Sequence, residues 1–244
     1  MTLGDLFKWC DTIVPEVTED VIPSISSTKL DKRAILNAGA AEFVLIANCF
    51  PKEKKISCIA NNPTYSLSSN ISDFMSMREE GVWHLRSDAS VNTWERLKPK
   101  TIRDLDQEFT NWRDQDPSDL SLCYYQDGDT LGIFYTPSTA VTNGFNVYYY
   151  ANSSDMSLTT HYPFTGTSVR DIRLASYEKY LLLYYESKAL GVIGYKTDAE
   201  AKLSQFYLLC SKAKNELDSR RDLAQESRVR PKTILNYARS SFKR

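Results

Sequence analysis

The chain has 244 residues, of which 42% are hydrophobic and 25% charged, and its formal net charge is −1. This composition is ordinary for a folded protein and excludes a disordered, collagen-like or coiled-coil chain. At ~150 residues per domain, the length predicts one or two domains. Apolar runs are too short for a membrane span, and the first residues lack the apolar core of a secretory signal.

Charge is distributed unevenly along the chain. Residues 220–244 contain eight Lys or Arg and two Asp or Glu, whereas residues 1–219 contain 22 basic and 29 acidic residues. An acidic body therefore precedes a basic C-terminal segment. Such segments bind nucleic acid or acidic protein surfaces. The alternative is a terminus that is only solvated.

Patterns that carry catalysis or metal binding do not stand out. The five cysteines are odd in number and widely spaced, so we expect reduced, mostly buried thiols and neither disulfides nor a zinc site. His84 and His161 have no second histidine at ligand spacing. Gly-rich phosphate loops, Gly-x-Ser-x-Gly and His-Glu-x-x-His are also missing from the sequence. We therefore expect no enzyme activity, no catalytic residue, no bound cofactor and no metal.

Two helices are expected at the start of the chain. Residues 2–14 have apolar side chains at helical spacing after Thr2, the candidate N-cap. Prolines and serines predict a loop over residues 15–29. The second helix is expected at residues 29–48, where the small residues 38–41 would let another helix approach closely.

The middle of the chain changes to the alternating pattern of strands. Gly81 follows two glutamates and predicts the turn of a hairpin, and Asn143-Gly144 predicts another turn. The clearest signal is Asp127-Gly128 between two apolar runs, because glycine takes positive φ at no steric cost. Strands are expected at residues 55–60, 64–68, 74–78, 82–85, 94–97, 122–126, 131–135 and 146–151, with a short helix at 101–112.

Helical spacing returns after Pro163. Ser168 with Asp171 resembles a capping box and predicts a helix over residues 169–190. Thr197 is the expected cap of a second helix at 198–227. Beyond it, apolar anchors lie between basic residues, so we expect the arm to dock on a partner. Its expected docking residues are Arg228, Arg230, Lys232, Ile234, Leu235, Tyr237, Arg239, Phe242, Lys243 and Arg244.

These elements predict an α+β fold, in which N- and C-terminal helices form a bundle around a central antiparallel β domain, with an extended C-terminal arm. Fourteen of the fifteen tyrosines lie from Tyr124 onward, and tyrosine suits half-buried sheet faces and protein interfaces. The expected divisions are residues 1–50 (N-terminal helices), 51–165 (β-rich domain), 166–227 (C-terminal helical hairpin) and 228–244 (basic arm). Candidate subunit-interface residues are Tyr148, Tyr149, Tyr150, Tyr184 and Tyr185.

Three segments between these helices resemble a known family. They are LCYYQDGDTLGIFYTPS at residues 122–138, FNVYYYA at residues 145–151, and Tyr162-Pro163-Phe164. Together with the order of elements, over roughly residues 30–227, they resemble the head-to-tail adaptor (connector ring) proteins of tailed bacteriophages, especially those of short-tailed phages. The chain departs from the family pattern at Tyr135-Thr136 and at Asn152-Ser153-Ser154, where that pattern has prolines.

The resemblance implies a structural virion protein. Such adaptors assemble in the host cytoplasm as a homo-oligomeric ring, typically a dodecamer, beneath the portal protein of the filled capsid. They extend the channel through which genomic DNA leaves and offer a platform for tail and nozzle proteins, with no membrane involved. By analogy, residues 228–244 would dock on the portal and residues 51–165 would face tail components or neighbouring copies.

A ring of this kind needs two different complementary surfaces on each subunit. The Tyr-rich face and the small-residue helix are the candidates. A net-negative body lining the channel would let DNA slide without binding to it.

Two other interpretations stay open. The chain could be another tail, neck or capsid accessory interaction protein, or a host-encoded scaffold. It could also be an enzyme, or a DNA-binding protein acting through its basic C-terminal tail. Ring assembly with a portal favours the adaptor, a monomer that ignores portals favours the second class, and salt-sensitive DNA binding lost with residues 228–244 favours the third.

Overall fold

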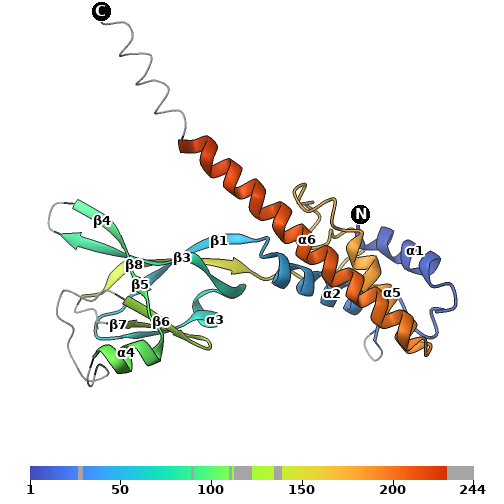
Figure 1. The fold of residues 1–244 in the computed structure, drawn as a ribbon, viewed down its shortest axis with the longest axis horizontal. Helices are drawn as coiled ribbons and strands as arrows, with labels where there is room; N and C mark the ends of the chain where they lie inside the picture. The colour runs from blue at the N-terminus through green and yellow to red at the C-terminus, as the bar shows by residue number, and fades with distance from the viewer. Residues whose placement is uncertain (27–29, 89–90, 110–111, 113–122, 135–138, 230–244) are drawn as a thin grey trace, which may run out of the picture. The chain divides into compact units, whose positions relative to one another are not determined.

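The structure is a computed structural model that describes residues 1–26, 30–88, 91–109, 112, 123–134 and 139–229 (Figure 1). The chain divides into two compact units. The helical unit comprises Met1–Cys49 and Ser153–Arg244, and the strand unit comprises Phe50–Asn152. The long helices and the two sheets occur in separate parts of the sequence, which confirms the predicted α+β class.

Helices from both ends of the chain build the helical unit. In Figure 1, α5 and α6 form a hairpin, α2 packs against both of them, and α1 packs on α5 and α2. The hairpin follows from the short connection between α5 and α6, since short connections make neighbouring helices antiparallel. The bounds of these helices are α1 Leu3–Ile13, α2 Lys32–Ala47, α5 Tyr180–Val192 and α6 Lys196–Val229.

The first two helices begin at capping side chains. The Thr2 hydroxyl accepts from the Asp5 amide, and the Asp5 carboxylate accepts from the Thr2 amide, so the expected cap of α1 is confirmed as a capping box. The Asp31 carboxylate accepts from the Ala34 amide at 2.6 Å and starts α2 three residues later than expected. Asn48, at φ 47°, ends that helix.

The expected start of the third helix was wrong. Ser168 and Asp171 form no capping box, because the Asp171 carboxylate accepts from the Arg173 amide at 2.9 Å. Residues 171–179 instead form successive turns, in which the Leu174 amide bonds to the Asp171 carbonyl and the Tyr177 amide bonds to the Leu174 carbonyl. The regular helix α5 begins only at Tyr180.

The small residues of α2 allow the close approach that the sequence predicted. A Cβ atom on Gly39 would lie 2.9 Å from Cδ1 of Tyr184 on α5, which is closer than real side chains come. Phe43, one turn further on, contacts Phe164 and Tyr177 with tilted rings, at 4.9 Å and 5.6 Å between centroids. Glycine therefore sets the spacing of the two helices and aromatic rings fill the space beside it.

The strand unit contains two four-stranded sheets. The first has the order β1-β8-β3-β4 and is antiparallel, as predicted. The second has the order β2-β7-β6-β5 and is mixed, because β5 runs parallel to β6. The strands are β1 Pro51–Cys58, β2 Thr64–Ser66, β3 Phe74–Asp88, β4 Val91–Arg96, β5 Lys98–Pro99, β6 Cys123–Asp127, β7 Thr130–Phe134 and β8 Val141–Ala151, with short helices α3 Leu67–Asn70 and α4 Ile102–Glu108.

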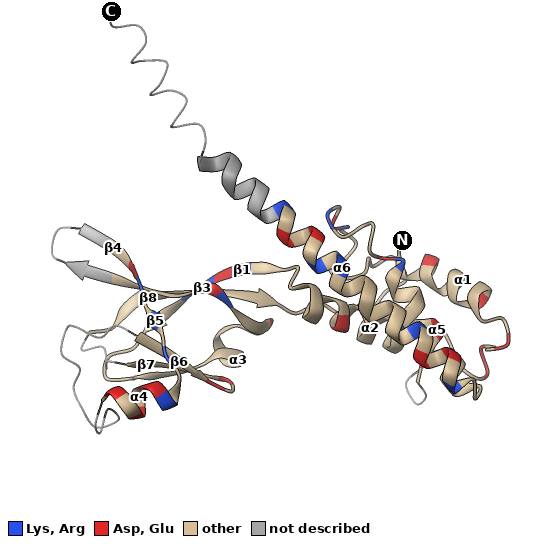
Figure 2. Ribbon diagram, viewed as in Figure 1, with Lys and Arg blue, Asp and Glu red and all other residues tan. Residues whose placement is uncertain are grey.

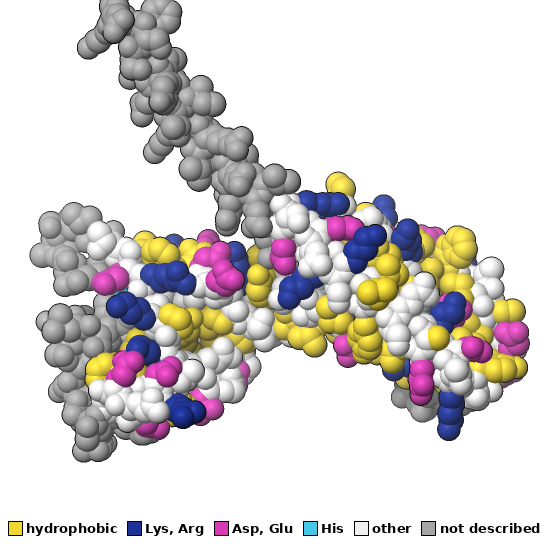
Figure 3. Space-filling model, viewed as in Figure 1, with side chains coloured by type: hydrophobic (Ala, Val, Ile, Leu, Met, Phe, Trp, Pro, Cys, Tyr) yellow, Lys and Arg dark blue, Asp and Glu magenta, His cyan; other side chains and the backbone are white. Residues whose placement is uncertain are grey.

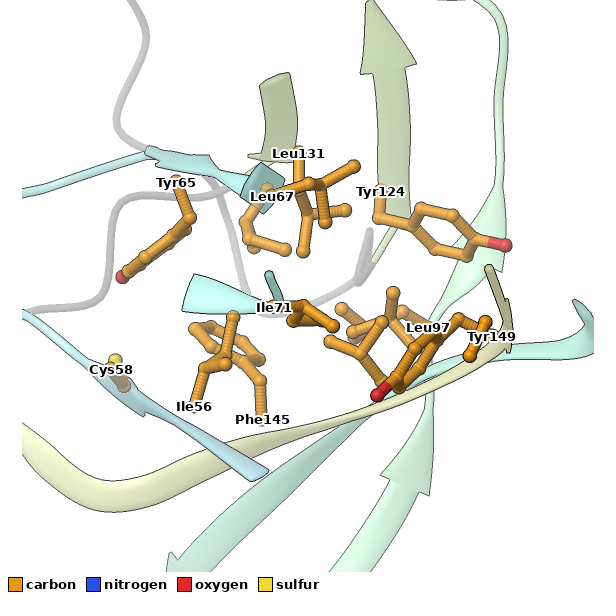
Figure 4. Packing of buried hydrophobic residues seen from close by; sticks show 14 residues of the cluster. Ile56, Cys58, Tyr65, Leu67, Ile71, Leu97, Tyr124, Leu131, Phe145 and Tyr149 are labelled. Carbon is orange, nitrogen blue, oxygen red and sulfur yellow. The ribbon is translucent and has the colours of Figure 1, made fainter. Parts of the chain in front are cut away.

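Both sheets contribute to one hydrophobic core. Figure 4 shows Tyr65, Leu131 and Tyr124 of the second sheet facing Ile56 and Phe145 of the first. The rings of Tyr65 and Phe145 meet edge to face at 5.3 Å between centroids. Alternate residues of β1, β7 and β8 thus enter a shared interior.

Three predicted turns had different outcomes. Asp127-Gly128 lies at the expected hairpin of β6 and β7, with Gly128 at φ 55°. The expected hairpin at Gly81 was wrong, because Met77 and Val82 both pair with β8 and residues 78–81 form a bulge in one strand. The expected turn at Asn143-Gly144 is likewise a bulge inside β8.

The β-rich region ends at Asn152, earlier than the expected residue 165. Residues 153–165 belong to the helical unit because their backbone is bonded to it. The Leu3 amide donates to the His161 carbonyl at 2.8 Å, and the Gly4 amide donates to the Thr159 carbonyl at 2.9 Å. Asn37 of α2 exchanges two hydrogen bonds with the backbone of Met156.

Candidate interaction surfaces

Reactive side chains are buried in both units. All five cysteines are free and buried, as expected. Burial raises the pKa of the thiols of Cys10 and Cys210 to about 12 and that of Cys123 to about 11. Thiols with such pKa values are protonated and unreactive at neutral pH. Within the described ranges, no group of three metal-ligating side chains comes together.

Three charged residues are buried among those described, and Lys32 is the one whose side chain has no exposed surface. Its Nζ donates to Asp11 at 2.5 Å and to Glu19 at 2.6 Å. Burial pulls the pKa of Lys32 down, but the hydrogen bonds to the two carboxylates raise it overall. The lysine therefore ties α1 and the following loop to the start of α2, which is a structural role.

Three of the five candidate interface tyrosines are core residues, which corrects the prediction for them. Tyr149 lies in the core between the sheets and donates its hydroxyl to Asp73 at 2.9 Å. Tyr184 and Tyr185 are buried in α5. Burial is the main cause of the raised pKa of each of these tyrosines. Their rings fill the interior of their own units and offer no surface to a neighbour.

Tyr148 and Tyr150 point to the opposite face of β8 and are half-buried. The Arg78 guanidinium lies over both rings, at 5.9 Å from the Tyr148 centroid and 5.8 Å from the Tyr150 centroid. Trp83 meets Tyr148 edge to face at 6.4 Å. We call this surface the outer sheet face, and the strand register adds to it one row of Lys55, Asn146, Trp83 and Arg96.

The outer sheet face has the composition of a protein interface. Trp, Tyr and Arg are the residues enriched there and among binding hot spots. Glu53 and Glu80 lie among the cations, where Glu80 pairs with Arg78 and Glu53 accepts from Asn146 at 3.3 Å. Mixed charge of this kind suits a protein partner better than a polyanion.

Large apolar side chains are also exposed on the helical unit. Ile172 is 85% exposed, Val169 is 70% exposed and Leu208 of α6 is 70% exposed. Figure 3 shows hydrophobic side chains on this unit among charged ones, and Figure 2 shows both signs of charge along α6. Sequence reasoning missed Val169 and Ile172 as exposed residues, because both fell inside the helix expected at residues 169–190.

A shallow groove of about 490 Å³ lies along α2 in the same unit. Its floor is Ala34, Ala38 and Ala41, which are exposed on one side of the helix. Residues 155–157 form a wall, held by the hydrogen bonds between Asn37 and Met156. We call this feature the α2 groove.

The predicted docking arm lies almost wholly outside the described residues. Arg228 is in the last turn of α6, and Arg230, Lys232, Ile234, Leu235, Tyr237, Arg239, Phe242, Lys243 and Arg244 follow the described part of the chain. The arm assignment therefore stays a prediction.

The chain matches none of the protein-family models and none of the curated proteins with which it was compared. Of the described helices, none combines the length and the apolar character that crossing a bilayer requires.

Proposed function

We propose that the chain is a structural protein of the head-tail connector of a tailed bacteriophage. In this proposal it forms an oligomeric ring that docks on the portal, extends the DNA channel and provides the tail with its attachment platform. It acts by binding other proteins and catalyses no reaction. The observation that carries the proposal is the order of elements along the sequence. Helices near both ends of the chain precede and follow one continuous strand-rich insertion.

The resembling segments support the proposal by their positions. LCYYQDGDTLGIFYTPS contains the β6–β7 hairpin, and FNVYYYA is the C-terminal part of β8, in which residues 145, 147, 149 and 151 are core residues. Both segments contribute to the core of the strand unit. The resemblance therefore includes residues that determine the fold of the strand unit, and is not confined to exposed residues.

Exposed groups of the kind used for protein contact support the proposal further. The outer sheet face offers Trp, Tyr and Arg side chains, and the helical unit exposes Val169, Ile172 and Leu208. A ring subunit needs at least two such surfaces that differ from each other. Each unit supplies one.

The charge balance fits passage of DNA through the ring. Residues 1–219 carry more acidic than basic groups, so a channel lined by this body would repel the phosphate backbone and leave DNA free to move. A map of the ring in which basic side chains line the channel would contradict this part of the proposal.

Electron microscopy of the phage particle tests the proposal, together with mass spectrometry of its proteins. We expect the chain in purified particles, in several copies, as a ring in contact with the portal. A chain that is absent from particles, or that is present as a single isolated copy, would overturn it. A ring located elsewhere in the tail or on the capsid would favour the accessory-protein alternative.

A further inference from the structure

Two side chains protrude from the helical unit just before α5. Ile172 and Val169 are two of the most exposed large hydrophobic residues among those described, at 85% and 70%. Exposure of both side chains to water does not stabilise a monomer, whereas burial against a partner would stabilise a complex. We call the pair the knob.

The knob is held rigidly by the segment around it. The Thr165 hydroxyl donates to the Val169 carbonyl at 2.8 Å. Arg170, between the two apolar residues, donates to buried Glu178 through Nε and Nη2 at 2.8 and 2.6 Å. Leu174, two residues after Ile172, is buried. Because these contacts fix the backbone, binding through the knob costs little conformational entropy.

The α2 groove has the complementary shape and charge. Its alanine floor is apolar and lacks large side chains, so its 490 Å³ leave room for branched aliphatic groups. Two charged residues line it: Arg33 pairs with Asp31 at 3.5 Å, and Asp155 lies in the wall with an exposed carboxylate. The knob carries the opposite charge beside it, since the Arg173 side chain is 66% exposed and has donors beyond those that bond to Asp171.

We propose that the knob of one copy inserts into the α2 groove of a second copy of this chain. Ile172 and Val169 would cover the floor formed by Ala34, Ala38 and Ala41, and Arg173 would pair with Asp155. The inference rests on the proposed ring in naming a second copy as the occupant. It goes further by assigning the two surfaces through which neighbouring subunits meet.

Knob and groove are different surfaces of the same chain, so the contact is head to tail. Each bound copy keeps one free knob and one free groove. Contacts of this kind close into a ring if the rotation between neighbours permits, and otherwise continue as a filament. A symmetric dimer would need the same patch on both partners.

Cysteine crosslinking tests the contact directly. The native cysteines are all buried, so a short bis-maleimide reagent will react with introduced thiols. We expect the double variant Ile172→Cys with Ala38→Cys to give a ladder of dimers, trimers and larger species. A mixture of the two single variants should give a covalent dimer and stop there.

Substitutions test whether the contact drives assembly. Ile172→Asp places a charge in the apolar contact, and Ala38→Trp fills the groove. We expect each variant to shift the sedimentation distribution of the full chain toward monomer. Ile59→Asp, at a residue that is 53% exposed in the strand unit, is the matched control and should leave assembly unchanged. Unchanged circular dichroism will show that the variants fold.

Mixing the two variants gives the sharpest result. The Ile172→Asp chain keeps its groove and the Ala38→Trp chain keeps its knob, so together they should form a one-to-one dimer and nothing larger. The charge swap Asp155→Arg with Arg173→Asp should restore assembly lost in either single variant.

The inference is overturned if the double-cysteine chain gives no ladder, or if Ile172→Asp assembles as well as the wild type. Its failure is distinguishable from failure of the proposed function. If the Ile172→Asp chain still forms the ring on the portal, only the knob contact is refuted. If the chain forms an oligomer that depends on the knob but is absent from phage particles, only the connector role is refuted.

Discussion

At the scale of single residues, two glycines with positive φ have different reasons to be there. Gly81, at φ 62°, lies in the bulge of β3 under the ring of Tyr124. A Cβ atom there would overlap the Tyr124 hydroxyl and lie 3.0 Å from Cζ. Gly128, at φ 55° in the β6–β7 hairpin, has no atom within 4 Å of that position. Backbone conformation requires glycine at both positions, and packing requires it only at Gly81.

This difference predicts unequal costs for the same substitution. We expect Gly128→Ala to destabilise the strand unit by about 1–2 kcal/mol through backbone strain, and Gly81→Ala by about 2–5 kcal/mol because overpacking adds to the strain. Urea unfolding followed by tryptophan fluorescence measures both. Tyr124→Phe should recover part of the Gly81→Ala loss. Equal costs for the two glycine variants would contradict the packing argument.

The carboxyl of Glu19 makes the stability of the helical unit depend on pH. Hydrogen bonds from Lys32 and Ser24 lower its pKa from the ordinary 4.5 to about 2. A carboxyl whose pKa is lower in the folded chain stabilises it above pH 4.5, and that contribution is lost as pH falls from 4.5 toward 2.

We therefore expect Glu19→Gln to be less stable than the wild type at pH 7 and to lose less stability between pH 4.5 and 2. Denaturant unfolding at several pH values measures the difference. Glu16→Gln, at an exposed glutamate of the same loop, is the control and should keep the wild-type pH profile. Parallel profiles for Glu19→Gln and the wild type would show that the Lys32 contact contributes nothing.

At the scale of elements, local signals predicted well and distant pairing did not. Thr2 with Asp5 marks the start of α1, and Asp127-Gly128 marks a hairpin, because each signal acts within a few residues. Gly81 after two glutamates has the composition of a turn. It is a bulge because both flanking segments pair with β8, which is more than 60 residues away in the sequence. A strand's partner is not encoded in its own turn residues.

The candidate surfaces show the same limit. Tyrosine counts suggested an interface, yet Tyr149 and Tyr185 are core residues, because a tyrosine can be buried when its ring has neighbours. The α2 groove depends on a segment 119 residues from α2 that is held there by Asn37. Sequence periodicity predicts which alanines of α2 are exposed, but it does not predict that residues 155–157 lie beside them.

Asn37 thus has a predictable role in joining two elements. Its side chain accepts from the Met156 amide at 3.0 Å and donates to the Met156 carbonyl at 3.2 Å. We expect Asn37→Ala to cost about 1–3 kcal/mol, because the partly buried amide and carbonyl of Met156 each lose this partner. Asn37→Asp, which keeps only the acceptor, should cost less. Amide hydrogen exchange at Met156 should accelerate in the same order, and unchanged exchange would place the anchor of this segment elsewhere.

At the scale of the whole molecule, the chain leaves and re-enters the helical unit once. The strand unit is one continuous segment, Phe50–Asn152, whereas the helical unit needs both ends of the chain. The two ends meet where α2 packs on α5 and α6. Folding of the helical unit therefore requires contacts between residues separated by the full length of the insertion.

The described buried contacts of α6 lie before residue 228, where the basic arm begins. Buried residues of α6 run from Ala199 through Phe206, Cys210 and Ala213 to Leu217. Tyr177 donates to Glu216 at 2.8 Å near the end of that stretch. Deleting residues 228–244 shortens α6 by its last two residues and removes none of these contacts, so we expect the unfolding temperature of the helical unit to stay unchanged.

Under the proposed function, this deletion should abolish binding to the portal ring encoded by the same phage, measured by pull-down and by electron microscopy of the mixture. Two variants separate charge from apolar contact. Replacing the basic residues of the arm with Gln keeps Ile234, Leu235, Tyr237 and Phe242, whereas replacing those four with Ser keeps the charge. A binding site on the portal would contact both the basic and the apolar residues of the arm, so each variant should bind the portal weakly. Salt-sensitive DNA binding that survives the Ser replacements and is lost with the Gln replacements would instead assign the arm to DNA. Undiminished portal binding after the deletion would refute the arm's docking role.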